Sequence, residues 1–284
     1  MPLSFNSLVA LAAGGAIGIT IAVYIALFEP STKYTPRIIH SNACRYYVQF
    51  FMMGAQVLFK RMFILQLTGA AIDPNECAVV LLNHSSAIDY FLAYALAEDI
   101  RIDRIFFYVY GRCVPFPTAR VLLNMARRRT NWAVSSKRMH GKFKEFLGSP
   151  KAGKWVIMFP EVSMFSAQLA LEHQAYCYIA GAPSLSKLLY PRFSSVIPGI
   201  EYLRSSITAV YDLRVQYGPV NQDVSLVPPI SVALAGRKQW VIDVFVTRIP
   251  ITKVPRTSKK MERWLEKLWY KKDRQLKKGR QAPV

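Results

Sequence analysis

The sequence predicts an α/β fold: a layered domain with a mostly parallel or mixed central sheet flanked by helices, preceded by an N-terminal transmembrane helix. Three observations carry this prediction. An uncharged apolar run lies near the N-terminus, short β-rich runs alternate with longer mixed segments after residue 75, and 52% of the 284 residues are apolar, enough for a buried core. We expect an anchor at 1–32, a membrane-associated helical segment at 33–75 and an α/β domain at 76–284 with a basic C-terminal helix.

The run from Leu8 to Phe28 contains no charged residue, and as a helix it would be about 31 Å long, which matches the hydrocarbon core of a bilayer. A cleaved signal peptide is the alternative, but no basic region precedes Leu8. Basic residues begin only at Lys33. The positive-inside rule therefore predicts that the chain after Phe28 faces the cytosol.

A second apolar segment, Tyr46 to Phe59, is too short to span a bilayer and is followed by Lys60 and Arg61. Its aromatic residues beside a basic pair are typical of an interfacial or re-entrant helix. A helix buried in the soluble core would have the same pattern.

The remaining elements are predicted from apolar periodicity and turn residues. The expected strands are Ala78–Leu82, Ile105–Tyr110, Trp155–Phe159, Ile207–Val215, Ile230–Ala235 and Trp240–Ile249. The expected helices are Ser86–Ala97, Arg120–Ala126, Ser136–Leu147, Ala167–Ala180 and Ser258–Gln275. The last helix carries Trp264 and Trp269 among lysines, so it could lie on anionic lipid or pack on the core.

The formal net charge of +20 indicates polyanionic partners such as nucleic acid, anionic lipid or phosphorylated metabolites. No recognisable nucleic-acid module accompanies the charge, so we expect no nucleic-acid partner. The four cysteines form no C-x-x-C pair, which argues against a zinc module and against a disulfide scaffold. We expect free thiols in a reducing compartment.

The densest polar cluster follows the apolar strand that ends at Leu82 and contains Asn83, His84 and, five residues after the histidine, Asp89. Active sites of α/β folds lie beyond strand ends of this kind. Asp89 could bind one imidazole nitrogen and leave the other free to accept a proton from a substrate hydroxyl. Ser86-x-x-Asp89 is also a capping box, which explains those two residues without catalysis.

Two further clusters complete the candidate chemistry. Pro160, Glu161 and Ser163 follow the strand that ends at Phe159. Arg127–Arg129 could clamp a phosphate through paired charge-assisted hydrogen bonds, although a solvated basic face is the simpler reading of such a run.

These blocks resemble, in order and spacing, the glycerolipid acyltransferases typified by 1-acylglycerol-3-phosphate acyltransferase. The matching blocks are Asn83-His84-(x)4-Asp89, a basic block ending near Arg129 and Trp132, and Phe159-Pro160-Glu161. The later blocks Leu189–Arg192, Ala209–Leu213 and Arg248–Ile251 resemble the eukaryotic branch that includes lysocardiolipin acyltransferase.

The resemblance implies that His84 deprotonates the free hydroxyl of a lysophospholipid, most simply 1-acyl-glycerol-3-phosphate, and that Asp89 orients it. Acyl-CoA would be the co-substrate, with no cofactor and no metal. The implied substrate-binding residues are Asn83, Arg128, Arg129, Glu161, Ser163 and Arg192. The implied setting is the bilayer of the endoplasmic reticulum or another intracellular membrane, with the catalytic domain facing the cytosol.

The third block departs from the family pattern of Phe-Pro-Glu-Gly-Thr, because Val162 and Ser163 stand at its last two positions and Met164 follows. Glycine would permit a backbone conformation that the branched valine opposes. Arg214 also stands where the branch usually has threonine. An alternative function is therefore a catalytically silent homologue that serves as a membrane lipid-binding or scaffold protein.

Overall fold

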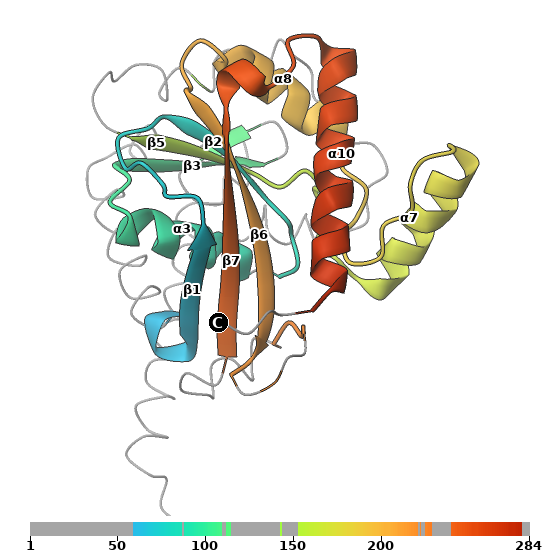
Figure 1. The fold of residues 1–284 in the computed structure, drawn as a ribbon, viewed down its shortest axis with the longest axis horizontal. Coiled ribbons are helices and arrows are strands. Elements are labelled where there is room, and N and C mark those ends of the chain that lie inside the picture. Colours follow the sequence, from blue (N-terminus) through green and yellow to red (C-terminus); the bar gives the residue numbers. More distant parts are fainter. Residues whose placement is uncertain are drawn as a thin grey trace, which may run out of the picture.

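The computed structural model describes residues 59–86, 88–109, 112–114, 143, 153–220, 222, 225–228 and 240–279. Its centre is a seven-stranded mixed sheet with the strand order β1-β7-β6-β2-β5-β3-β4 (Figure 1). The strands are β1 (Phe63–Gly69), β2 (Ala78–Leu82), β3 (Arg104–Val109), β4 (Arg112–Val114), β5 (Lys154–Met158), β6 (Ala209–Pro219) and β7 (Trp240–Pro250).

Four neighbouring strands, β6, β2, β5 and β3, run parallel to one another. The β6–β7 and β3–β4 pairs are antiparallel, and β1 is parallel to β7. Because β2 lies inside the parallel block and is buried on both faces, it is a continuous apolar run rather than an alternating one.

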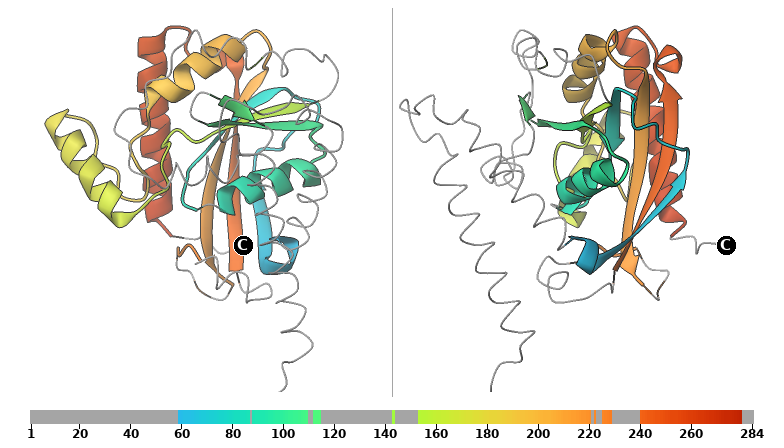
Figure 2. Two further views of the ribbon diagram at one scale, coloured as in Figure 1. Left: turned by 180° about the vertical axis from the view of Figure 1, so that it is seen from behind. Right: turned by 90° about the vertical axis from the view of Figure 1, so that its left-hand side faces the viewer.

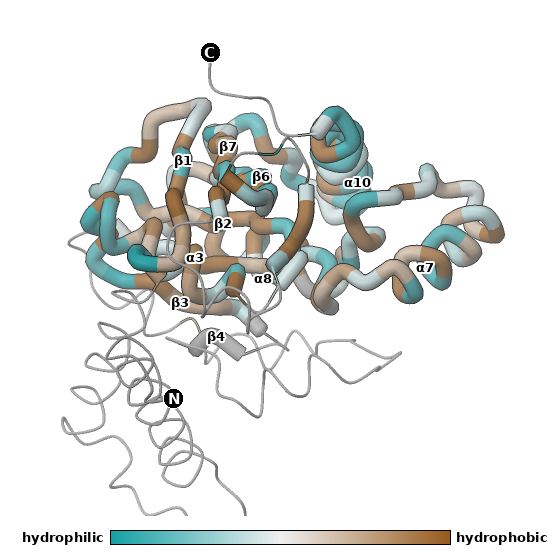
Figure 3. Tube along the Cα trace, turned by 90° about the horizontal axis from the view of Figure 1, so that it is seen from below, coloured by the Kyte–Doolittle hydropathy of each residue, from teal (hydrophilic) through white to brown (hydrophobic). Residues whose placement is uncertain are grey.

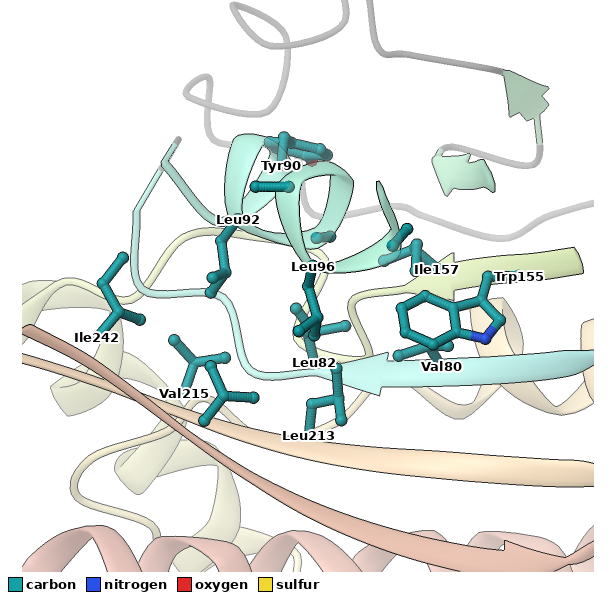
Figure 4. Packing of buried hydrophobic residues seen from close by; sticks show 14 of the residues in the cluster. Val80, Leu82, Tyr90, Leu92, Leu96, Trp155, Ile157, Leu213, Val215 and Ile242 are labelled. Atoms are coloured by element: carbon teal, nitrogen blue, oxygen red, sulfur yellow. The ribbon is translucent and has the colours of Figure 1, made fainter. Parts of the chain in front are cut away.

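Helices cover both faces of the sheet, as the edge-on view in Figure 2 shows. The helices are α3 (Ile88–Asp99), α7 (Ala167–Ile179), α8 (Phe193–Leu203) and α10 (Ser258–Lys277), and a short 3₁₀ turn, Ile251–Lys253, links β7 to α10. One core lies under α3, where Leu92 and Leu96 pack towards Val80 and Leu82 (Figure 4). The second core joins Val79 and Leu81 to residues of α8 and α10.

The structure confirms the predicted α/β class with a mixed sheet and flanking helices. The expected strands beginning near residues 78, 105, 155, 207 and 240 are present, with ends shifted by up to four residues. The expected helices at 86–97, 167–180 and 258–275 are present as α3, α7 and α10. The expected strand at 230–235 and helix at 120–126 fall outside the described residues, as does the expected helix at 136–147 apart from the single residue 143.

Three elements correct the sequence prediction: β1, α8 and the short strand β4, for which no strand was expected. The expected helical segment 33–75 is wrong over Phe63–Gly69, which forms β1 at the edge of the sheet and pairs with β7. Helix α8 was not expected because Pro198 lies inside it and proline lowers helix propensity.

Among the described residues no helix has the length and apolar character needed to cross a membrane. The predicted anchor at 1–32 lies outside them.

Candidate active site

The site is built where two adjacent parallel strands end. Leu81 of β2 pairs with Met158 of β5, so the segments that follow these strands leave the same edge of the sheet. The first carries Asn83 and His84, and the second carries Glu161. The backbone N–H of His84 donates to the carboxylate of Glu161 over 3.0 Å, which joins the two segments directly. The position beyond the strand ends is the one predicted from the sequence.

The imidazole of His84 contacts the carboxylate of Asp89 as the spacing predicts. Nδ1 of His84 lies 2.9 Å from Oδ2 of Asp89, and both side chains are 0% exposed. With Nδ1 carrying the proton toward the carboxylate, Nε2 is the basic nitrogen of the ring. The pair therefore has the geometry of an oriented general base.

The capping box is present as well, so the two interpretations of Asp89 are compatible. Oδ2 of Asp89 accepts the backbone N–H groups of Ser85 and Ser86 over 2.7 and 2.8 Å. Oγ of Ser86 accepts the N–H of Ile88 over 3.2 Å. The first turn of α3 thus fixes the carboxylate that orients the imidazole.

Tyr217 of β6 adds a fourth donor to this carboxylate and was missed by the sequence analysis. Its hydroxyl donates to Oδ1 of Asp89. Burial and the neighbouring Asp89 carboxylate raise the pKa of Tyr217 well above its usual value, so the hydroxyl keeps its proton and remains a donor. No local motif marks this residue, because it lies 128 positions from Asp89 in the chain.

The other ring nitrogen of His84, Nε2, is buried and has no hydrogen-bond partner within the described part of the chain. Aromatic side chains enclose the ring: the centroid of Phe159 lies 4.4 Å away and that of Tyr90 lies 5.3 Å away in an edge-on arrangement. An unpaired buried nitrogen is unfavourable unless a ligand supplies its partner. The His84–Asp89 pair, which we call the dyad, therefore presents Nε2 as a hydrogen-bond acceptor that no described residue uses.

Glu161 binds backbone groups with both carboxylate oxygens. Oε1 accepts from His84 N–H, and Oε2 accepts from the N–H of Leu189 over 2.9 Å. Burial raises the pKa of Glu161 to about 8, although the two N–H donors and the nearby Lys272 oppose this change. Glu161 thus holds the His84 segment against the loop before α8.

Asn83 extends the pairing of β2 with β6 by one residue through its side chain. Its Oδ1 accepts from the N–H of Val215 over 2.8 Å, and its Nδ2 donates to the carbonyl of Val215 over 2.9 Å. The amide therefore ends the strand and sets the direction in which the chain enters the His84 loop.

The turn after β5 places Val162 in the left-handed region, with a φ of 65°. The N–H of Val162 donates to the carbonyl of Phe159, and the N–H of Ser163 donates to the carbonyl of Glu161 over 2.7 Å. The second bond closes a three-residue γ-turn centred on Val162, a rare and strained form at positive φ. The backbone at position 162 therefore has the left-handed conformation that favours glycine, as expected from the family pattern.

The other implied binding residues differ in how well the structure places them. Ser163 and Arg192 are half-buried next to the site, and the N–H of Arg192 donates to the carbonyl of Pro160 over 2.8 Å. Arg128 and Arg129 lie outside the described residues. Within the described ranges no group of three or more His, Cys, Asp or Glu side chains could hold a metal ion.

A buried ion pair connects helix α10 to the site. Nζ of Lys272 lies 2.5 Å from Oδ1 of Asp212 and donates to the carbonyl of Leu213 over 3.0 Å. Burial lowers the pKa of Lys272 and raises the pKa of Asp212, and each group's charge opposes the shift of the other. The same ammonium group also favours the ionised form of Glu161.

The fold and the His-Asp pair define an α/β protein with a candidate general-base site, and comparisons with known proteins agree. A family model described as "Acyltransferase C-terminus" matches residues 233–278. The chain is similar to 1-acyl-sn-glycerol-3-phosphate acyltransferase 3 of Arabidopsis thaliana, with 23% identity over 214 residues, 72% of this chain and 54% of the relative. It is also similar to the delta enzyme of Bos taurus, with 26% identity over 212 residues, 70% of this chain and 52% of the relative.

A third relative, 1-acyl-sn-glycerol-3-phosphate acyltransferase gamma of Homo sapiens, is 23% identical over 213 residues, 70% of this chain and 52% of the relative. The chain spans about half the length of the curated relatives it matches. No solved structure matches it. The matches confirm the resemblance to the 1-acylglycerol-3-phosphate acyltransferase family that the sequence blocks indicated.

Proposed function

We propose that this protein is a membrane-bound acyltransferase that moves a fatty acyl group from acyl-CoA to the free hydroxyl of a lysophospholipid, most simply 1-acyl-glycerol-3-phosphate, to give phosphatidic acid. The observation that supports it most is the buried dyad, in which Asp89 holds Nδ1 of His84 and Nε2 has no partner among the described residues. The named relatives supply the chemical class.

In the proposed reaction Nε2 of His84 accepts the proton of the acceptor hydroxyl while that oxygen attacks the thioester carbonyl. The new C–O ester bond forms, the C–S bond breaks, and the coenzyme A sulfur leaves. The imidazolium returns its proton to that sulfur. Asp89 stabilises the imidazolium through Nδ1 and prevents the ring from rotating. No protein nucleophile takes part.

The buried ring sets one requirement for this mechanism. His84 is 0% exposed, so the atoms that cover Nε2 must move aside before the acceptor hydroxyl can reach hydrogen-bond distance of this nitrogen. Once water is excluded, the proton transfer proceeds in a low-dielectric environment where the Asp89 charge acts strongly.

We assign different tasks to the residues that the resemblance implies for binding. Asn83 and Glu161 position the His84 segment, because their polar atoms bind the protein backbone. Ser163 and Arg192 remain the described candidates for contact with the acceptor. The proposed phosphate-binding role of Arg128 or Arg129 completes the set.

The test is the transfer of a labelled acyl group from acyl-CoA to a panel of lysophospholipids by the purified full chain and by His84→Ala. Removing a general base lowers the rate by about 10²–10⁴-fold. Arg104→Ala, which removes an exposed side chain at the start of β3, is the control and should retain activity. A His84→Ala protein with the wild-type rate would contradict the mechanism, and an inactive wild type would contradict the acyltransferase assignment.

The strained turn at Val162 favours a second candidate, a silent homologue that binds lipid without acyl transfer. In this case the wild type is inactive and Val162→Gly restores transfer, because glycine relaxes the turn that carries Glu161. If Val162→Gly changes the rate of an active wild type only slightly, the site tolerates valine and this candidate is excluded.

A further inference from the structure

Helix α10 has two faces of opposite character. Its buried residues face the sheet and α8: they are Met261, Leu265, Trp269, Lys272, Asp273 and Leu276. The tryptophan at 269 is 0% exposed, so of the two expectations for this helix its packing on the core is the one observed for Trp269. The remaining face is free to meet another surface.

The outward face carries only basic ionised groups. The exposed basic residues of the helix, which we call the basic stripe, are Lys259, Lys260, Arg263, Lys267, Lys271, Arg274 and Lys277. At 3.6 residues per turn these seven positions fall within an arc of about 120°, opposite the buried apolar face. Lys277 also pairs with buried Asp273 over 3.0 Å, while Glu262 and Glu266 of the same helix are only half-exposed.

A second helix also exposes large apolar side chains. Helix α7 lies outside α10 (Figures 1 and 3) and exposes four large side chains, Leu171, Tyr176, Tyr178 and Ile179, at 66, 61, 89 and 85%. No charged residue occurs from 174 to 186. Tyr190, which packs near Tyr176, donates its hydroxyl to Glu266 of α10 over 2.5 Å and so links the two helices.

We propose that the basic stripe of α10 is a docking surface for the anionic headgroups of a lipid bilayer. The argument is charge complementarity: seven cations in one arc match a sheet of phosphates, and basic residues near an anionic membrane are each attracted to it. The exposed tyrosines and isoleucine of α7 favour a bilayer over nucleic acid or an acidic protein, because such side chains are typical of the membrane interface. This inference does not depend on acyl transfer.

The experiment measures the reactivity of individual lysines in the full chain, reconstituted in nanodiscs of neutral phosphatidylcholine or of phosphatidylcholine with phosphatidylserine. A neutral amine-acetylating reagent and mass spectrometry give the modification rate of each lysine. We expect Lys259, Lys267 and Lys271 to react at least about threefold more slowly in the anionic discs. Exposed Lys187 and Lys253, which lie off the stripe, serve as internal controls and should be unchanged. In about 1 M salt the protection should disappear, because the Debye length falls to about 3 Å.

A matched pair of variants separates the stripe from net charge. Lys259→Gln with Lys267→Gln should reduce the protection of Lys260 and Lys271, whereas Lys187→Gln with Lys253→Gln removes the same charge and should leave it intact. Equal reactivity of the stripe lysines in both kinds of disc would overturn the proposal, as would an equal loss of protection in the two pairs of variants. Neither outcome would bear on acyl transfer, which the His84→Ala assay tests separately.

Discussion

The γ-turn at Val162 gives the most direct test of the local structure. With a φ of 65°, this position disfavours any residue that has a Cβ. A comparison of Val162→Gly with Val162→Ala isolates that effect, because both changes remove the branched side chain and differ only in the Cβ. The comparison avoids the loss of side-chain packing that would complicate a comparison with the half-buried wild-type valine.

The expected difference follows from two opposing contributions. A Cβ in the left-handed region costs about 1–2 kcal/mol, whereas glycine loses about 0.5–1 kcal/mol relative to alanine through the greater freedom of its unfolded chain. The free energy of unfolding of Val162→Gly should therefore be about 0–1.5 kcal/mol above that of Val162→Ala, with a midpoint of about 0.75 kcal/mol. In a chain of this size the difference corresponds to about 1–3 °C in the midpoint of thermal unfolding.

The measurement is denaturant or thermal unfolding of the purified full chain in detergent. Leu171 is a suitable control because it is 66% exposed inside α7, where glycine should be about 1 kcal/mol less stable than alanine. The order of the two variants should thus be opposite at 162 and at 171. An alanine variant at 162 that is about 1 kcal/mol more stable than the glycine variant, as at 171, would refute the left-handed conformation.

Two other predictions concern ionisation. Tyr217→Phe removes the hydroxyl donor to Asp89, so the carboxylate interacts more strongly with the imidazolium of His84, and the acidic limb of the pH–rate profile should move to higher pH. An unchanged limb would show that Tyr217 does not act through the dyad. Burial alone would raise the pKa of Glu76, but hydrogen bonds from Arg248, Tyr211 and Thr208 hold this pKa at about 2, below its usual 4.5. Ionised Glu76 therefore stabilises the fold above pH 4.5 by at most about 3.4 kcal/mol. The stability difference between wild type and Glu76→Gln, from urea midpoints, should shrink as pH falls from 4.5 towards 2, and a constant difference would contradict the low pKa.

The sequence alone predicted the features that depend on residues only a few positions apart in the chain. His84 and Asp89 are five residues apart across a helix start, so the spacing alone predicts that the carboxylate can reach the imidazole, and the structure has this contact at 2.9 Å. The capping box and the main strands were predictable for the same reason: apolar periodicity and cap residues act over a few positions.

Strand β1 was not predictable in this way. Its seven residues follow an apolar segment and a basic pair, a pattern that indicated a membrane-associated helix. What makes Phe63–Gly69 a strand is its pairing with β7, which begins at Trp240. A parallel partner so distant in the chain leaves no mark on the local pattern.

The sequence by itself determined the α/β class, the dyad and the place of the dyad at a strand end. Only the tertiary structure decided the surroundings of the dyad: Tyr217 on Asp89, Glu161 on the backbone of His84, and the basic face of α10 turned away from the core. The physical reason is that sheet order brings together residues 77 and 128 positions apart, and burial, rather than residue type, then fixes which of their atoms find partners.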